Sequence, residues 1–313
     1  MPVPTISICI PAYKRTQFLT RLLDSIEMQT YKDFEVVVTD DSNDEQVVDL
    51  CKIYAKKFPL RYHKNPVQFG AAANWNRCMQ LGEGTWLKIM HDDDWFATKD
   101  ALGMFAAATQ KNVQFVWCNY FIKNDSTQQV TEKKKSESTI RRNIQNPFLL
   151  FGENIIGPPS CVMVHRSVPV KYDVNMTWLV DVDYYINVLL HEKNGYYISS
   201  PIVYFSHNDV QLTNLHFNNK VTEIKESLLL WEKHGLRMIQ GILNYDAWWR
   251  MIRNLNIRSA QDFDQYTTGL KVPQFIYDII SFQKNLPIKV LRNPIVSKLS
   301  MAFCYRFIYL KNQ

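Results

Sequence analysis

The strongest constraint on the fold is an alternation of short apolar runs and helical patterns over the first 118 residues. Four runs have the length and the β-branched or aromatic content of buried parallel strands, namely Ile6–Ile10, Phe34–Thr39, Trp86–Met90 and Val113–Cys118. Between them, apolar side chains recur at helical spacing over 19–26 and 47–54. This alternation predicts an α/β fold whose sheet is mostly parallel and covered by helices on both faces.

The remainder of the chain has two further patterns. Residues 123–146 are polar and charged with almost nothing to bury, so we expect a mobile loop or lid there. From about residue 216 onward, apolar residues again recur at helical spacing, which predicts a helical C-terminal region. We therefore expect a first domain over 1–212, with parts 1–118 and 119–212, and a helical appendage over 213–313.

The net charge of +6 is concentrated at the C-terminal end of the chain. The chain has 36 lysine and arginine residues against 30 acidic ones, and 271–313 holds seven of the former and one of the latter, which leaves 29 of each elsewhere. A neutral body argues against nucleic-acid binding, which needs clustered cations. The basic tail predicts contact with an anionic membrane surface, and its apolar part, 295–310, is suited to an interface. The alternative is that this tail packs on the rest of the chain with its cations in water.

Cysteine usage and hydropathy bear on the compartment. The six cysteines are scattered and form no C-x-x-C pair, which favours a reduced chain. No leader pattern is seen at the N-terminus, and no uncharged apolar stretch reaches the length of about 18 residues that a membrane span needs. We expect a cytoplasmic protein that is at most peripheral on the inner face of the cell membrane.

Acidic clusters follow two of the predicted strands. Asp40 and Asp41 come after the second run, and Asp92, Asp93 and Asp94 come after the third. The carboxyl ends of parallel strands are where such sheets bind ligands. Three consecutive carboxylates exceed the single acceptor that a helix cap requires, so we expect a hard cation, Mn²⁺ or Mg²⁺, of the kind shared with phosphates. The chain has neither G-x-G-x-x-G after its first strand nor a P-loop, which disfavours dehydrogenases and P-loop kinases.

Four segments, taken in order and with their spacing, resemble one known family. They are SICIPAYKR at 7–15, VVVTDDSND at 36–44, GAAANWNRC at 70–78 and GTWLKIMHDDD at 84–94. They are similar to the family 2 nucleotide-sugar glycosyltransferases of the GT-A fold, and the similarity extends over about residues 5–210. The resemblance implies a Rossmann-like, mostly parallel sheet flanked by helices. It also implies that 1–118 bind the nucleotide-sugar donor, that 119–212 form the acceptor side, and that the helical C-terminal region is an appendage.

The resemblance also implies roles for individual residues on the donor side. Asp94 matches the metal ligand and Asp93 the acid beside it that contacts ribose or metal, while Asp92 and His207 are further candidates for the metal. Asp41 matches the carboxylate that accepts a hydrogen bond from uracil. The remaining donor contacts are expected from Pro11 and Tyr13 in the base pocket, Arg15 at the diphosphate and Asn76 at ribose or phosphate.

On the acceptor side, Asp181 matches the general base and Asp183 an acid at the start of a helix. Direct displacement by one activated hydroxyl predicts inversion at the anomeric carbon. The chain lacks the Q-x-x-R-W motif of polymerising relatives, so we expect addition of a single hexose or N-acetylhexosamine, with a UDP-sugar favoured as donor. The expected acceptor is a glycan or a polyprenyl-diphosphate-linked glycan of bacterial surface polysaccharide, for example lipopolysaccharide.

Two other functions stay open at this point. A sugar nucleotidyltransferase would share the nucleotide-binding sheet and the metal but would attack phosphorus, so it would not need Asp181. A non-catalytic subunit that binds sugar nucleotides or glycans would have lost its metal or base residues, and this chain retains both. A glycoside hydrolase is disfavoured because hydrolysis needs a carboxylic acid of raised pKa on the leaving oxygen.

Overall fold

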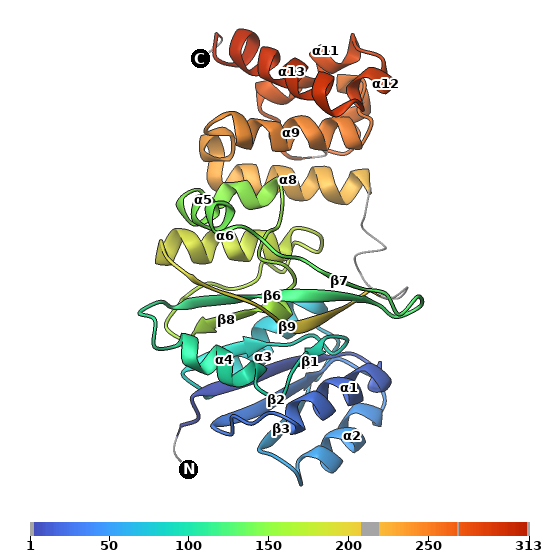
Figure 1. Ribbon diagram of the computed structural model, residues 1–313. Coiled ribbons are helices and arrows are strands. Elements are labelled where there is room, and N and C mark those ends of the chain that lie inside the picture. Colours follow the sequence, from blue (N-terminus) through green and yellow to red (C-terminus); the bar gives the residue numbers. More distant parts are fainter. Residues whose placement is uncertain (1–2, 208–218, 268, 312–313) are drawn as a thin grey trace. The chain divides into compact units, whose positions relative to one another are not determined.

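The computed structural model describes residues 3–207, 219–267 and 269–311 (Figure 1). The chain forms two compact units. Unit 1 comprises Met1–Pro147, Ile155–Asn175 and Asp183–Gln211, and unit 2 comprises Phe148–Asn154, Met176–Val182 and Leu212–Gln313. The predicted domain boundary between 212 and 213 lies outside the described residues.

Unit 1 is built on one mixed sheet whose N-terminal half is parallel. β1 (Ile6–Ala12) lies between β2 (Phe34–Asp40) and β4 (Trp86–Ile89), and β3 (Leu60–Lys64) lies outside β2, all in parallel. Because these strands point the same way, the turns after β1, β2 and β4 meet at one edge of the sheet. The predicted α/β fold with a parallel N-terminal sheet is confirmed.

The second half of the sheet mixes directions. β8 (Val162–His165) pairs antiparallel with both β4 and β6 (Phe115–Asn124), whereas β9 (Tyr196–His207) runs parallel to β6. Two short strands complete it, since β5 (Trp95–Phe96) pairs with β9 and β7 (Val130–Glu132) pairs with β6. The strand order within the described residues is β3-β2-β1-β4-β8-β6-β9-β5, with β7 beside β6.

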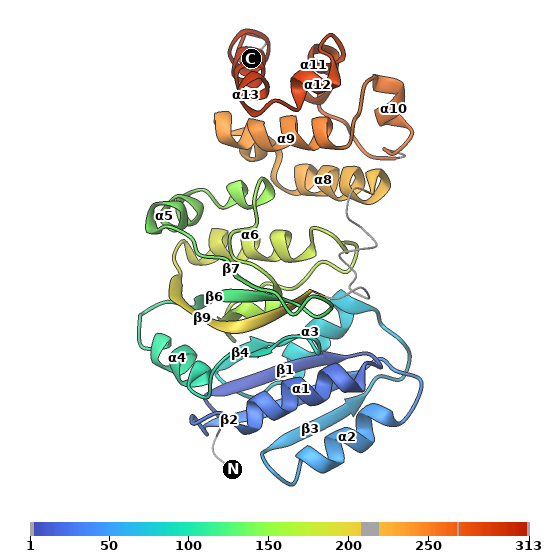
Figure 2. The ribbon, with the colours of Figure 1, turned by 45° about the vertical axis from the view of Figure 1, so that its right-hand side comes forward.

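Helices cover both faces of the parallel strands. α1 (Thr16–Glu27), α2 (Gln46–Tyr54) and α4 (Ala101–Ala108) share a core with the alternate β1 residues Ile6, Ile8 and Ile10. α3 (Ala71–Leu81) packs against the opposite face, where the Cys78 thiol contacts the carbonyl oxygen of Val37 at 3.3 Å. Figures 1 and 2 show α1 and α3 on either side of β1.

Two glycines of the predicted motifs are required by the backbone. At Gly84, a Cβ would lie 2.5 Å from the amide nitrogen of Ser7, so no side chain fits between β1 and the turn before β4. Gly70, which precedes α3, has φ of +83°, in the region that favours glycine. These constraints explain why the motifs at 70–78 and 84–94 begin with glycine.

The expectation of a loop over 123–146 is wrong for much of that segment. It contains the end of β6, β7 and the helix α5 (Glu137–Gln145). The Ser136 hydroxyl caps α5 by accepting from the Thr139 amide at 3.2 Å, and Ile140 and Asn143 are buried. One cap and a few covered residues, namely Ile140, Asn143 and half-buried Ile144, therefore suffice to fix a helix that is otherwise mostly exposed.

Unit 2 is helical, as predicted. Its described elements are η1 (Pro147–Phe151), α8 (Lys220–His234), η3 (Gly235–Ile239), α9 (Ile242–Asn254), α10 (Ala260–Asp264), α11 (Gln274–Lys284), α12 (Ile288–Leu291), α13 (Pro294–Cys304) and the π-helical turn η4 (Tyr305–Tyr309). Tyr245, Trp248 and Trp249 of α9 are fully buried and form its core. No helix in the described part of the chain is long and apolar enough to cross a bilayer.

Candidate active site

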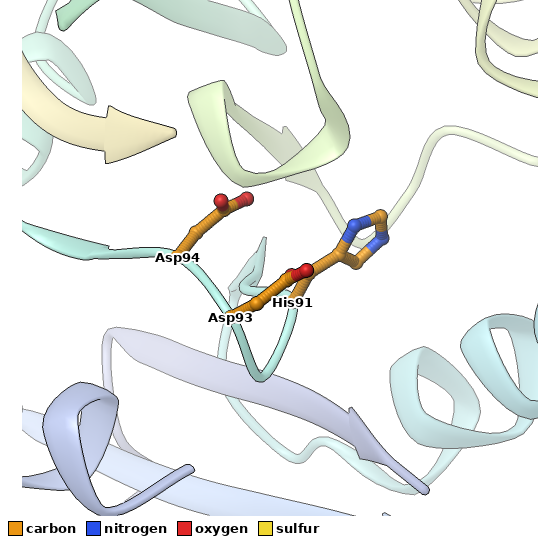
Figure 3. A group of neighbouring side chains, drawn as sticks. All are labelled: His91, Asp93 and Asp94. Atoms are coloured by element: carbon orange, nitrogen blue, oxygen red, sulfur yellow. The ribbon is translucent and has the colours of Figure 1, made fainter. Parts of the chain in front are cut away.

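A tight turn after β4 presents the acidic cluster. The Asp94 amide donates to the His91 carbonyl oxygen at 3.2 Å, and the His91 amide donates to Ser160 Oγ at 2.9 Å. From α1, Arg21 Nη2 donates to the Asp93 carbonyl oxygen at 2.8 Å. These bonds fix the backbone of the turn, so that the side chains of His91, Asp93 and Asp94 lie close together (Figure 3).

This trio has the features of a metal site. One ligand atom from each of His91, Asp93 and Asp94 lies within 4.8 Å of the other two. Asp94 Oδ1 accepts from the Ser206 amide at 3.0 Å, but Asp94 Oδ2 and His91 Nε2 are buried without a hydrogen-bond partner. Buried polar atoms are normally satisfied, so two such atoms in one group fit the donor set of a cation site. Carboxylates with one imidazole suit Mn²⁺ better than Mg²⁺, which prefers oxygen alone.

The electrostatics of the turn also fit a cation. Burial, followed by the charge of Asp93, raises the pKa of Asp94 well above its usual value. Burial lowers the pKa of His91 to about 4, so the imidazole is neutral and its nitrogen lone pair is available. A cation beside Asp94 would therefore stabilise the charged form of this carboxyl, which burial disfavours.

The third aspartate of the turn, Asp92, is paired with Arg15. The Arg15 guanidinium binds Asp92 through two nitrogens, with Nε 3.3 Å from Oδ2, and binds Asp93 through Nη1 at 3.0 Å. Burial raises the pKa of Asp92 to about 7 although Arg15 opposes the shift. Asp92 is not part of the trio of possible ligands. Arg15, which the resemblance predicts at the diphosphate, instead forms ion pairs with Asp92 and Asp93, and 31% of its side chain is exposed.

A hollow of about 290 Å³ lies at the ends of β1 and β2. Asp41 is buried in its wall, where it accepts from Asn65 Nδ2 at 2.6 Å and from the Gly70 amide at 2.9 Å. Predicted Tyr13 also lines the hollow, whereas predicted Pro11 is buried within β1 and does not. The full lining is Tyr13, Asp41, Ser42, Asn43, Lys64, Asn65, Pro66, Val67 and Gln68.

Two further predicted residues lie elsewhere. Both side-chain amide atoms of Asn76 bond the Tyr172 backbone, at 2.8 Å to its oxygen and 2.9 Å to its nitrogen, so this contact accounts for Asn76 without a ligand. His207 is the last residue of β9, is exposed, and is not grouped with the ligand trio.

Lys88 is a residue that sequence reasoning passed over. It is fully buried in β4, and its ammonium donates to the carbonyl oxygens of Ile89, at 3.0 Å, and Ser160. Burial lowers the pKa of Lys88 to about 8. A lysine inside an apolar strand was the available signal, because a buried ammonium needs several acceptors.

Asp181 belongs to unit 2 and stands in the first turn of α6 (Val180–Glu192). Its Oδ1 accepts from the Val182 amide at 2.9 Å and its Oδ2 from Asn154 Nδ2 at 3.0 Å. Burial raises the pKa of Asp181 to about 6, a suitable value for a base near neutrality. Asp181 is partly exposed whereas Asp183 is buried, as expected for helix residues two apart.

Glu226, which belongs to no recognisable motif, binds the segment that precedes α6. It is buried in α8 of the same unit. Its two oxygens accept four hydrogen bonds, from the amide and hydroxyl of Thr177, both at 2.8 Å, and from the amides of Trp178 at 2.9 Å and Leu179 at 2.7 Å. A carboxylate thus satisfies donors at the helix start and fixes the segment that leads to Asp181.

The model of glycosyl transferase family 2 matches residues 7–171 of the chain, more than half of its length. The chain belongs to glycosyl transferase family 2. An uncharacterised glycosyltransferase of Haemophilus influenzae is 23% identical over 289 residues, 88% of this chain and 94% of the relative. The Escherichia coli protein WcaA, provisionally named as a colanic acid biosynthesis glycosyl transferase, is 23% identical over 281 residues, 86% and 98% of the two chains.

Solved structures agree on the fold. S. aureus TarS 1-349, crystallised with UDP-GlcNAc, superposes with a TM-score of 0.64 at 14% identity, covering 99% of this chain and 92% of that one. The mannosyltransferase PcManGT of Pyrobaculum calidifontis, solved with GDP-Man and Mn²⁺, gives 0.53 at 12% identity, covering 96% and 86%. This chain therefore has the GT-A fold, and it is a glycosyltransferase of family 2. Membership of this family favours glycosyl transfer over the nucleotidyltransferase and the non-catalytic subunit.

Proposed function

We propose that this glycosyltransferase is metal-dependent and inverting, and that it moves one sugar from a nucleotide diphosphate, with UDP favoured, to an acceptor hydroxyl. The observation that carries the proposal is the pair of unpartnered buried atoms, Asp94 Oδ2 and His91 Nε2, in one group with Asp93. These three side chains would hold Mn²⁺ or Mg²⁺. When bound, the cation would stabilise the negative charge that develops on the diphosphate leaving group.

The chain's own residues perform the other tasks in this proposal. The hollow beside Tyr13 and Asp41 takes the nucleoside, and Arg15 fixes the acidic turn through Asp92 and Asp93. Asp92 and His207 stay predictions as additional metal contacts, as do Pro11 and Asn76 as donor contacts.

Asp181 acts as the general base. The acceptor oxygen forms a bond to the anomeric carbon, the bond from that carbon to the diphosphate oxygen breaks, and the hydroxyl proton passes to the Asp181 carboxylate. The raised pKa of about 6 supports this role, because a base accepts a proton most readily when its pKa lies near the working pH. One displacement inverts the anomeric configuration.

The acceptor is the second substrate of the proposed reaction. We favour a glycan or a polyprenyl-diphosphate-linked glycan in bacterial surface polysaccharide assembly, with the reaction in the cytoplasm. Support comes from the names of relatives. WcaA is named for colanic acid biosynthesis. Proteins of Mycobacterium bovis and Mycobacterium tuberculosis, 35% identical over 109 residues, are named for PGL/p-HBAD biosynthesis. The domain roles predicted above, donor binding by 1–118 and acceptor binding by 119–212, belong to the same proposal.

A donor screen tests this function. Thermal unfolding of the full chain is followed with UDP-, GDP- and dTDP-sugars, each with and without Mn²⁺. We expect UDP-sugars to raise Tm only when Mn²⁺ is present, because binding to the folded state alone stabilises it. Stabilisation by a sugar nucleotide in the presence of a chelator would contradict the metal requirement. With the donor known, the anomeric configuration of the product, measured by NMR, tests inversion, and a retained configuration would refute it.

A further inference from the structure

The last helical segment of unit 2 turns its apolar side chains outward. Ile295, Leu299, Phe303 and Phe307 are 72%, 68%, 52% and 55% exposed. They recur every four residues along α13 and η4, so they lie along one side of the segment. The rings of Phe303 and Phe307 are 4.7 Å apart, which makes the stripe continuous.

The opposite side of α13 is the one that packs on unit 2. Ser297, Met301 and Cys304 are buried there. Trp249 Nε1 of α9 donates to Ser297 Oγ at 3.0 Å, and the Tyr245 hydroxyl lies 3.2 Å from Cys304 Sγ. The helix is therefore anchored by this other side, and the exposed apolar stripe contrasts with the polar residues that a surface helix normally presents to water.

The segment that carries the stripe is rich in exposed cations. Residues 279–311 contain no aspartate or glutamate and six exposed cations, Lys284, Lys289, Arg292, Lys298, Arg306 and Lys311. Lys298 directly precedes Leu299, and Arg306 directly precedes Phe307. Apolar side chains with adjacent cations match a bilayer surface that carries anionic headgroups.

We propose that the docking face, defined as Ile295, Leu299, Phe303 and Phe307 with Lys298 and Arg306, binds the surface of an anionic lipid bilayer. The apolar side chains enter the boundary between headgroups and acyl chains, and the cations pair with lipid phosphates. A second copy of the chain fits this face less well, because two surfaces with cations and no acids repel each other. The proposal rests on the proposed function in one respect, since a lipid-linked acceptor gives the enzyme a reason to bind there.

The test is sedimentation of the full chain with phosphatidylcholine vesicles, with and without phosphatidylglycerol, at low and high salt. The double variant Leu299→Gln/Phe307→Gln removes two apolar side chains that make little contact with the fold. Leu236→Gln is the matched control, because Leu236 is 65% exposed in η3 of the same unit. We expect the wild type and the control to sediment with the anionic vesicles at low salt, and the double variant to bind at least about tenfold more weakly.

Three results would overturn the proposal. They are failure of the wild type to bind anionic vesicles, equal binding by the double variant, and a concentration-dependent dimer, seen by light scattering, that the double variant abolishes without any vesicle binding. Calorimetric binding of UDP with Mn²⁺ is measured on the same samples. If the wild type binds vesicles but not UDP, the result counts against the proposed function alone. If it binds UDP but not vesicles, the result counts against the docking face alone.

Discussion

Replacing the proposed base is expected to separate stability from activity. Asp181 has a pKa raised from 3.8 to about 6, so its ionised form is disfavoured in the folded protein. At about 1.4 kcal/mol per pKa unit, the penalty near neutral pH is at most about 3 kcal/mol, and it is smaller in practice because the side chain is partly exposed. Asp181→Asn removes this penalty. Its side-chain nitrogen, however, then faces one of the two present donors, the Val182 amide or Asn154 Nδ2, and the loss of that hydrogen bond costs about 1 kcal/mol. We expect a net gain of about 1 kcal/mol.

The stability difference between Asp181→Asn and the wild type should depend on pH. The folded state keeps the Asp181 proton up to about pH 6, while the unfolded chain releases it near 3.8. Between these values the folded state binds more protons, so this group makes wild-type stability fall as pH rises, and the variant lacks that loss. The advantage of Asp181→Asn should therefore be absent near pH 4 and complete near pH 8, at which transfer should be at least about a hundredfold slower than in the wild type.

The assay is urea unfolding followed by tryptophan fluorescence at both pH values, together with the rate of nucleotide release with donor and acceptor. Asp49→Asn is the control, because Asp49 forms only an exposed pair with Lys52 on α2, with side chains 67% and 68% exposed. The control should change stability by less than about 0.5 kcal/mol at either pH. A variant that is destabilised near pH 8, or a stability difference that does not change with pH, would refute the electrostatic reasoning. Undiminished transfer would place the base elsewhere.

Three other substitutions test the supports of the site. Glu226→Gln should lower the free energy of unfolding by about 2 kcal/mol and reduce transfer while leaving UDP binding unchanged, because a glutamine side chain cannot accept all four hydrogen bonds from the segment before α6. The control Glu232→Gln, at an exposed position of α8, should change neither stability nor transfer. Arg15→Gln should cost about 2 kcal/mol in urea unfolding by leaving Asp92 unpaired, against almost nothing for Arg141→Gln, whose pair is exposed; equal effects would contradict the account. Since burial lowers the pKa of Lys88 to about 8, wild-type stability should rise relative to Lys88→Met as pH increases from 8 toward 10.5, and a flat difference would be contrary to this.

The parallel half of the sheet was predictable because its strands are buried on both faces. Such strands read as continuous apolar runs, and helices with one apolar side separate them, as at Leu19, Leu22, Leu23 and Ile26 of α1. β3 was not predicted, because the sequence LRYHK has no apolar run and its residues are only partly buried. The sequence pattern predicts a loop where β7 and α5 lie, because a strand on the rim and a mostly exposed helix need few apolar residues.

The acidic turn illustrates what a sequence pattern can and cannot predict about a site. Three consecutive aspartates after a strand indicated a cation, and the position of Asp94 in the turn supports that expectation. The pattern could not show which neighbour would complete the group, because that depends on side-chain direction. His91 lies with Asp93 and Asp94, whereas Asp92 points to Arg15. Glu226 could not be identified either, since its partners lie nearly fifty residues earlier in the chain.

In the proposed function, Asp94 holds a divalent cation that is needed for binding the nucleotide. The most direct measurement is calorimetric titration of UDP into the wild type and Asp94→Asn, each with and without Mn²⁺. Asparagine keeps an acceptor for the Ser206 amide but loses the charge that would hold the cation. The account predicts tight UDP binding only for the wild type with Mn²⁺, with affinity at least about a hundredfold lower in the other three titrations. Equal UDP affinity of the wild type with and without Mn²⁺, or an Asp94→Asn variant that still responds to Mn²⁺, would contradict it.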